Sequence, residues 1–235
     1  GHIEALTAWV IDQACGQLAA WQATHPALAV LGMHVNISGR DLTSATLVPR
    51  VRDVLQRHAL APSQLTLEIT ETTLMGKLKD VLDTVHALRE AGVKFSIDDF
   101  GTGYSSLAYL STLPIDSLKI DRSFVAGMSD KPQNVEIVRA VLTLGRSLGQ
   151  TIIAEGIETA TQLAMLEQMG VDVGQGYLLA RPLRADQVPA LLTSRPKAYR
   201  AAKRALPIWR SSPKPKAQKV KPLKNRWPRS ACRKA

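Results

Sequence analysis

The sequence predicts an α/β protein in which mostly parallel strands are covered by helices. The main observation is an alternation of strand-like and helix-like segments, which repeats about six times before residue 195. Such alternation returns each strand in the same direction, so parallel pairing is expected. A second observation is that no glycine-rich phosphate turn follows the first strand, which disfavours a Rossmann fold. A doubly wound open sheet and a (β/α) barrel both fit this pattern.

The first half of the alternation is read from apolar spacing and from turn residues. The expected elements are a helix over 3–23, a strand over 34–38, a helix over 42–59, a strand over 65–70, a helix over 77–90 and a strand over 93–98. Helical segments repeat apolar residues every three or four positions, and strands alternate them. We expect Pro49 near the start of its helix and Gly92 as a helix C-cap.

The second half continues the same alternation with shorter elements. It is expected to contain a helix over 105–112, a strand over 118–121, a helix over about 132–148, a strand over 152–155, a helix over 159–169, a strand over 171–177 and a helix over 185–193. Pro132 suits the first turn of its helix, and Gly149 and Gly170 end the two longer helices.

The charge divides the chain into a body and a tail. Residues 195–235 contain 15 Lys and Arg and no acidic residue, so the 30 basic and 20 acidic residues of the whole chain leave 15 basic and 20 acidic in the body. We expect one folded domain over 1–194 and a basic, proline-rich, disordered tail over 195–235. Binding of nucleic acid or anionic lipid by the tail is the less favoured interpretation, and a solubilising or accidental extension is preferred.

Localisation is inferred from apolar runs and cysteines. No run is long enough to span a membrane, and no signal peptide is visible. Cys15 and Cys232 lack metal-ligand spacing, which favours a reduced, cytoplasmic protein. Because the chain begins with Gly1 rather than Met, we expect it to be a fragment or a processed chain.

Two adjacent carboxylates, Asp98 and Asp99, stand where an apolar segment ends. Both stay ionised more readily with a positive charge between them, and hard divalent cations prefer oxygen ligands. Gly101 and Gly103 follow, and their conformational freedom is typical of a shaped loop at a strand end. The pattern favours a metal site over the alternative of a helix cap beside an exposed acid.

Polar residues lie late in several strands, on the face opposite the apolar one. In 65–70, for example, Leu67 and Ile69 share one face and Glu68 lies on the other. The residues in such positions are Asn36, Glu68, Asp98, Lys119, Asp121 and Glu155. In a barrel they would lie inside, at the C-terminal mouth where barrel enzymes hold their chemistry.

Each of these residues has a plainer explanation when it is taken alone. The alternatives are a turn or cap for Asn36, an exposed edge position for Glu68, a local ion pair for Lys119 with Asp121, and a helix start for Glu155 and Glu158. Their coincidence on at least four strands favours a metal cluster, because uncompensated buried carboxylates are costly. A two-metal site suggests hydrolysis of a phosphoryl ester, with Lys119 orienting a water or holding a phosphate oxygen.

Six ordered motifs carry a resemblance to a known family. They are Val35-Asn36-Ile37-Ser38, Glu68-Ile69-Thr70-Glu71, Asp98 to Leu107, Lys119-Ile120-Asp121-Arg122, Ala154 to Thr159, and Gln175-Gly176-Tyr177. Over roughly 1–193 the chain resembles the EAL-domain family of cyclic-di-GMP phosphodiesterases. The resemblance implies a modified (β/α)8 TIM-type barrel and Mg²⁺- or Mn²⁺-dependent cleavage of cyclic di-GMP to linear pGpG.

The resemblance also implies roles for individual residues. The implied metal ligands are Asn36, Glu68, Asp98, Asp99 and Glu155, with Asp121 as a further candidate. Lys119 would position the attacking water, so the catalytic set is Lys119, Glu68, Asp98 and Glu155. Gln175 would face the substrate, and Glu158 would support the site from behind. Glu71 would steady the loop after Asp99, which contains Gly101 and Gly103.

The same resemblance implies partners. The loop after Asp99 forms the dimer contact of the family, so a homodimer is expected. Sensory or cyclase-like domains often precede such domains, so a larger signalling protein in the bacterial cytoplasm is expected.

One departure concerns the Glu-Ala-Leu signature of the family. The chain contains Glu4-Ala5-Leu6, but these residues fall inside the first expected helix rather than on a strand before Asn36. We therefore expect the first barrel strands, the signature Glu and a nearby substrate-binding Arg to be missing, which leaves open sheet edges. This favours, as the alternative function, a catalytically inactive module that binds cyclic di-GMP or a protein partner.

Overall fold

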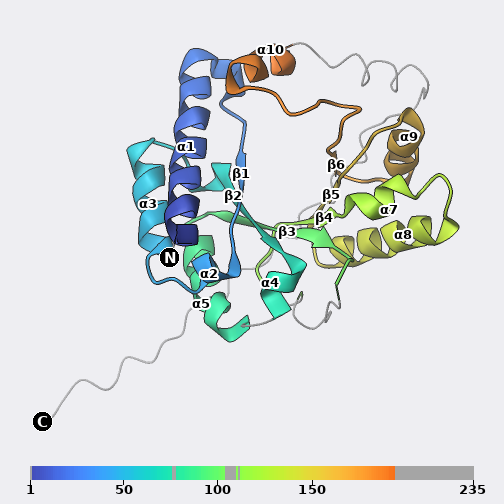
Figure 1. Ribbon diagram of the computed structural model, residues 1–235, viewed down its shortest axis with the longest axis horizontal. Coiled ribbons are helices and arrows are strands. Elements are labelled where there is room, and N and C mark those ends of the chain that lie inside the picture. The colour runs from blue at the N-terminus through green and yellow to red at the C-terminus, as the bar shows by residue number, and fades with distance from the viewer. Residues whose placement is uncertain (1, 76–77, 104–109, 111, 194–235) are drawn as a thin grey trace, which may run out of the picture.

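Six parallel strands form one curved sheet in the computed structural model, which describes residues 2–75, 78–103, 110 and 112–193. The strands are β1 (Met33–Asn36), β2 (Leu65–Thr70), β3 (Lys94–Phe100), β4 (Ser117–Ile120), β5 (Thr151–Ala154) and β6 (Val173–Gly174). They follow one another in sequence order, and the sheet curls into a half-barrel (Figure 1). The α/β barrel-type prediction is confirmed, because a doubly wound sheet reverses its strand order at a switch point.

The helices cover the convex side of this sheet (Figure 1). They are α1 (His2–Thr24), α2 (Gly39–Leu42), α3 (Leu47–Arg57), α4 (Glu71–Met75), α5 (Leu78–Glu90), α7 (Arg122–Ala126), α8 (Pro132–Ser147), α9 (Ala160–Met169) and α10 (Val188–Thr193). Short 3₁₀ turns occur at η1 (Pro26–Leu28), η2 (Pro62–Gln64) and η3 (Ala185–Gln187). No helix among the described residues is long and apolar enough to cross a membrane.

The expected single helix over 42–59 is wrong in its start, because two helices occupy this region. Ser38 caps α2 through a reciprocal hydrogen-bond pair with Asp41, and α2 then ends at Leu42 before α3 begins. Asp41 is buried and also accepts a hydrogen bond from Thr7 Oγ1 at 3.0 Å, which ties α1 to this turn. Pro49 lies in the first turn of α3, where its missing N–H costs no helical bond.

Four other segments differ from their expected bounds or fall outside the description. The strand expected over 171–177 is reduced to β6, while β3 continues two residues past Asp98 to Phe100. The expected helix over 105–112 lies largely outside the described residues, and so does the tail over 195–235. In the part of the chain that the structure describes, β1 and β6 each pair on one side only.

The main core lies between the convex face of the sheet and the helices. Leu67, Phe95, Leu118 and Ile152 come from four neighbouring strands, and all are 0% exposed. Burying one such side chain stabilises the fold by roughly 1.5–3 kcal/mol. With this face anchored, the alternating polar residues of the same strands are directed to the concave side.

We expect Cys15 to resist alkylation in the native chain. Its thiol is 0% exposed, and burial, assisted by the negative charge of Asp12, raises its pKa from 9.0 to about 11. Because the thiolate is the nucleophile, labelling near neutral pH should be at least about a hundredfold slower than in the urea-unfolded chain. Mass spectrometry of the Cys15 peptide after timed iodoacetamide treatment measures this ratio, and equal rates would contradict the packing of α1.

Candidate active site

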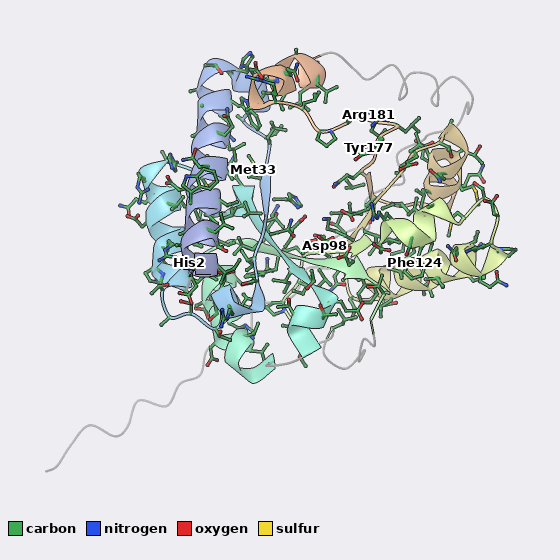
Figure 2. The ribbon with its side chains drawn as sticks, in the orientation of Figure 1. His2, Met33, Asp98, Phe124, Tyr177 and Arg181 are labelled. Carbon is green, nitrogen blue, oxygen red and sulfur yellow. The ribbon has the colours of Figure 1, made fainter. Side chains whose placement is uncertain are left out.

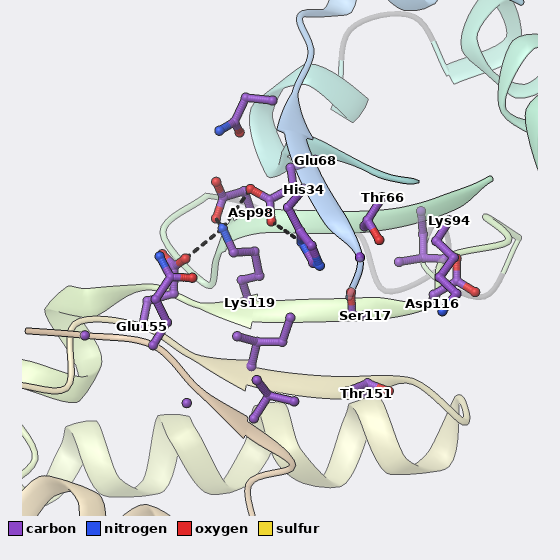
Figure 3. Close-up of a pocket in the computed structure, with 18 of the residues that line it drawn as sticks. His34, Thr66, Glu68, Lys94, Asp98, Asp116, Ser117, Lys119, Thr151 and Glu155 are labelled. Carbon is purple, nitrogen blue, oxygen red and sulfur yellow. Dashed lines mark hydrogen bonds and ion pairs between the residues drawn. The ribbon is translucent and has the colours of Figure 1, made fainter. Parts of the chain in front are cut away.

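An open pocket of about 1370 Å³ occupies the concave face of the half-barrel (Figure 3). Its lining takes alternate residues from successive strands or their ends, which are His34, Asn36, Thr66, Glu68, Lys94, Asp98, Ser117, Lys119, Thr151, Ile153 and Glu155. This alternation places the predicted polar face of the strands in the pocket. Asp98 lies near the middle of the molecule, in the hollow of the sheet (Figure 2).

Lys119 is the centre of a buried ion-pair cluster (Figure 3). Its Nζ lies 3.0 Å from Glu68 Oε2, 2.9 Å from Asp98 Oδ1 and 2.7 Å from Glu155 Oε1, and its side chain is 6% exposed. Burial alone would lower the pKa of Lys119, but the hydrogen bonds that Lys119 donates to the three carboxylates raise it above its ordinary value. Lys119 therefore stays protonated at neutral pH, and it acts as a hydrogen-bond donor rather than as a base.

Glu68 is held through both of its oxygens. Oε2 accepts from Lys119, and Oε1 lies 2.7 Å from His34 Nδ1. Burial raises the pKa of Glu68, but the hydrogen bonds and charges of His34 and Lys119 outweigh it and lower the pKa below the ordinary value. The ionised carboxylate can only accept, so His34 Nδ1 carries the proton of this hydrogen bond.

Asp98, Asp99 and Glu155 form a group that could hold a metal ion, with one oxygen of each within 4.8 Å of the others. Consecutive residues of a regular strand point to opposite faces, but the pairing of β3 with β4 shifts between Ile97 and Phe100. Asp99 also adopts a φ of 53°, in the left-handed region. This local irregularity lets two adjacent carboxylates approach the same point.

Burial is the largest cause that raises the pKa of Asp99, followed by the negative charges of Asp98 and Asp121. Asp121 caps α7 by accepting from Ser123 N at 2.9 Å, and it also shares a hydrogen bond with Asp99. The bonds from Ser123 lower the pKa of Asp121 in spite of its burial. A hydrogen bond between two carboxyl groups requires a proton, and a cation bound there would replace that proton.

Residues 101–103, at the start of the loop after Asp99, are held by a buried carboxylate. Glu71 is 4% exposed, and its Oε2 accepts from Gly101 N at 2.9 Å and Gly103 N at 3.3 Å. Gly101 has a φ of 99°, which disfavours any residue with a side chain, and a Cβ on Gly103 would lie 2.8 Å from Glu71 Oε1. Both glycines therefore permit this loop to close on Glu71.

The remaining predicted residues divide between the pocket and the exterior. Asn36 lines the pocket at the end of β1, in register with Glu68 on β2, and Gln175 lines it beside β6. Glu158 is exposed before α9, is not among the pocket-lining residues, and donates its backbone N–H to Gln162 Oε1. Glu4 lies in α1 outside the pocket, with Ser44 Oγ 3.5 Å from its Oε2.

His34 is the site residue that sequence reasoning missed. It lies on the polar face of β1, two residues before Asn36, and its side chain is 44% exposed. The alternation of His34 with the apolar Val35 predicts that His34 lies on this face. Only its contact with Glu68, 34 positions later, distinguishes it from an ordinary surface histidine.

Comparison with known proteins gave consistent matches. The protein-family model described as EAL domain matches residues 1–182. The bifunctional diguanylate cyclase/cyclic di-GMP phosphodiesterase MucR of Pseudomonas aeruginosa is 44% identical over 191 residues, which cover 81% of this chain and 27% of MucR. The cyclic di-GMP phosphodiesterase NbdA of the same species is 43% identical over 184 residues, which cover 78% and 23%.

A solved structure, "PaMucR Phosphodiesterase, c-di-GMP complex", matches with a TM-score of 0.75 and 43% identity. The match covers 80% of this chain and 75% of that one. The chain therefore matches most of that solved chain, whereas it spans about a quarter of the length of the two curated relatives.

Proposed function

The chain belongs to the EAL domain family, and from this premise we propose that it is a metal-dependent phosphodiesterase that hydrolyses cyclic di-GMP to linear pGpG in bacterial second-messenger signalling. The observation that carries the proposal is the buried Lys119, shared by Glu68, Asp98 and Glu155 beside the Asp98–Asp99 pair. The names of MucR and NbdA support the choice of substrate.

The donor set suits hard divalent cations, and Mg²⁺ or Mn²⁺ is proposed. The residues that would hold two ions are Asn36, Glu68, Asp98, Asp99, Asp121 and Glu155. All of them offer oxygen, which such ions prefer. Their five carboxylates and Lys119 carry a formal charge of −5 + 1 = −4, which two divalent ions balance. When bound, the ions would supply a water of lowered pKa and would stabilise charge on the attacked phosphorus.

Lys119 is proposed to orient the attacking water or a phosphate oxygen. An ammonium group has three N–H donors, and here three carboxylates lie within 3.0 Å of it. It can therefore take up a water or a phosphate oxygen only when one carboxylate leaves. Gln175, on the wall beside β6, is proposed to contact the substrate, and Glu158 to support the strand end that presents Glu155.

Partners and setting follow from the same family membership. We propose that the chain forms a homodimer through the loop after Asp99, which Glu71 holds in place. We also propose an upstream sensory or cyclase-like domain, since both curated relatives are about four times longer than the matched region. Its setting would be the cytoplasm, where the proposed substrate acts as a messenger.

A second candidate function is an inactive module that binds cyclic di-GMP or a protein partner without cleaving it. The observation that favours it is the position of Glu4, which lies in α1 and adds no carboxylate to the pocket. In addition, β1 and β6 have unpaired outer edges among the residues described. Turnover separates the two functions, because the cluster of Lys119 and its carboxylates is compatible with both.

The test is incubation of the 235-residue chain with cyclic di-GMP and Mg²⁺ or Mn²⁺, followed by chromatographic detection of pGpG. We expect turnover, and we expect EDTA to abolish it. Glu68→Ala should slow turnover by about 10²-fold or more, because it removes a charge from the metal site. Glu4→Ala is the matched control and should keep full activity, since Glu4 lies outside the pocket. Binding without turnover by a folded chain would support the second function instead.

A further inference from the structure

His34 contacts the ion-pair cluster around Lys119 through its hydrogen bond with Glu68. Its Nδ1 lies 2.7 Å from Glu68 Oε1, while its side chain remains 44% exposed at the pocket wall (Figure 3). Glu68 itself is only 7% exposed. A hydrogen bond to a buried carboxylate is a strong, charge-assisted interaction, so this contact is more than incidental surface pairing.

The two side chains that contact Glu68 differ in how many other partners they have. Lys119 is shared with Asp98 and Glu155, which lie 2.9 and 2.7 Å from its Nζ. The donor on His34 has Glu68 as its partner. A glutamate side chain has several rotatable bonds, and a single shared contact at Oε2 leaves the plane of its carboxylate undefined. The second contact, at Oε1, defines that plane.

The backbone explains why a residue on β1 can make this contact. In the parallel register of β1 and β2, His34 is opposite Thr66 and Asn36 is opposite Glu68. His34 and Glu68 are therefore diagonal neighbours on the same concave face, within reach of long side chains. The strand that carries Asn36, a proposed metal ligand, thus also carries a group that orients a second proposed ligand.

We propose that His34 is a positioning residue that orients the Glu68 carboxylate for metal binding, an inference that rests on the proposed metal-dependent function. Removal of such a supporting hydrogen bond typically weakens metal affinity about 10–100-fold. The role also keeps Glu68 in place if Lys119 releases it to hold a water or a phosphate oxygen.

The experiment compares Mn²⁺ affinity among the wild-type chain, His34→Phe and His34→Asn, without nucleotide, by electron paramagnetic resonance of the free ion. His34→Phe keeps an aromatic ring but removes the donor. His34→Asn loses the ring but keeps a donor bonded to Cγ, as Nδ1 is. We expect affinity to fall about 10–100-fold in His34→Phe and to stay within about threefold of wild type in His34→Asn.

A purely structural role for the ring predicts the reverse order, in which Mn²⁺ affinity is retained by His34→Phe and lowered in His34→Asn. Thermal unfolding in EDTA identifies any variant that is less folded, and the exposure of His34 argues that both variants fold. Equal Mn²⁺ affinity of wild type and His34→Phe would overturn the role of His34 alone. If the wild-type chain bound no Mn²⁺, the metal-dependent function and this role would both be overturned.

Discussion

Replacing Lys119 by methionine is expected to lower the free energy of unfolding by about 3–5 kcal/mol near neutral pH, the usual cost of removing one partner from a buried ion pair. Methionine fills a similar volume, so the loss comes mainly from charge. Glu68, Asp98 and Glu155 would lie together in a pocket without the cation that now lies within 3.0 Å of each. Urea denaturation in EDTA, which prevents rescue by metal ions, measures the effect.

The matched control for this variant is Lys94→Met. Lys94 lines the same pocket, but its side chain is exposed. A surface lysine contributes little to stability, so we expect the free energy of unfolding to change by no more than about 0.5 kcal/mol. Equal losses in the two variants would mean that the carboxylate cluster is not held by Lys119.

The loss of stability caused by Lys119→Met should also depend on pH. In the wild type the folded pKa of Glu68 lies below the ordinary value of 4.5, so its contribution is present above about pH 4.5 and is lost as pH falls through the folded pKa. The folded pKa of Lys119 is raised, so its contribution persists through neutral pH and is lost only in strongly basic solution. The difference in stability between wild type and variant should therefore shrink below about pH 4.5. A difference that stays constant from neutral to acid pH would exclude a charge effect.

Gly176→Ala is expected to destabilise the chain by about 3 kcal/mol or more, at the upper end of the usual cost of overpacking. A Cβ at this position would lie 2.2 Å from both the backbone N and O of Ile157. Those two atoms also bond to the segment around Gly176, since Ile157 N donates to Gln175 O at 3.1 Å and Ile157 O accepts from Leu178 N at 3.0 Å. The added carbon would therefore separate the segment that carries Gln175 from the rest of the pocket.

Gly149→Ala provides the control for backbone conformation. Gly149 also lines the pocket and has a φ of 70°, but a Cβ there would meet nothing within 4 Å. We expect it to cost only about 1–2 kcal/mol, the penalty of a left-handed conformation. Guanidinium denaturation of both variants separates steric conflict from conformational strain, and a smaller loss in Gly176→Ala than in Gly149→Ala would refute the predicted clash.

Residues near each other in sequence determined much of the architecture. Alternating apolar positions, as in Leu67 and Ile69 against Glu68, predicted which face of each strand packs on helices and which lines the pocket, because side chains of a strand alternate strictly. The repeated alternation of strands and helices predicted a parallel sheet. These local rules alone predict that Asn36, Glu68, Asp98, Lys119 and Glu155 share one face.

By contrast, only the tertiary structure decided which side chains of the site contact one another. The alternation of residues along the strands does not reveal that Lys119 forms ion pairs with three carboxylates, or that His34 forms a hydrogen bond with Glu68. These contacts depend on the register and curvature of neighbouring strands. Strict alternation also predicts that Asp98 and Asp99 point apart. The register shift in β3 and the left-handed backbone at Asp99 bring them together, since a bulge changes side-chain direction in a way that the residue pattern does not encode.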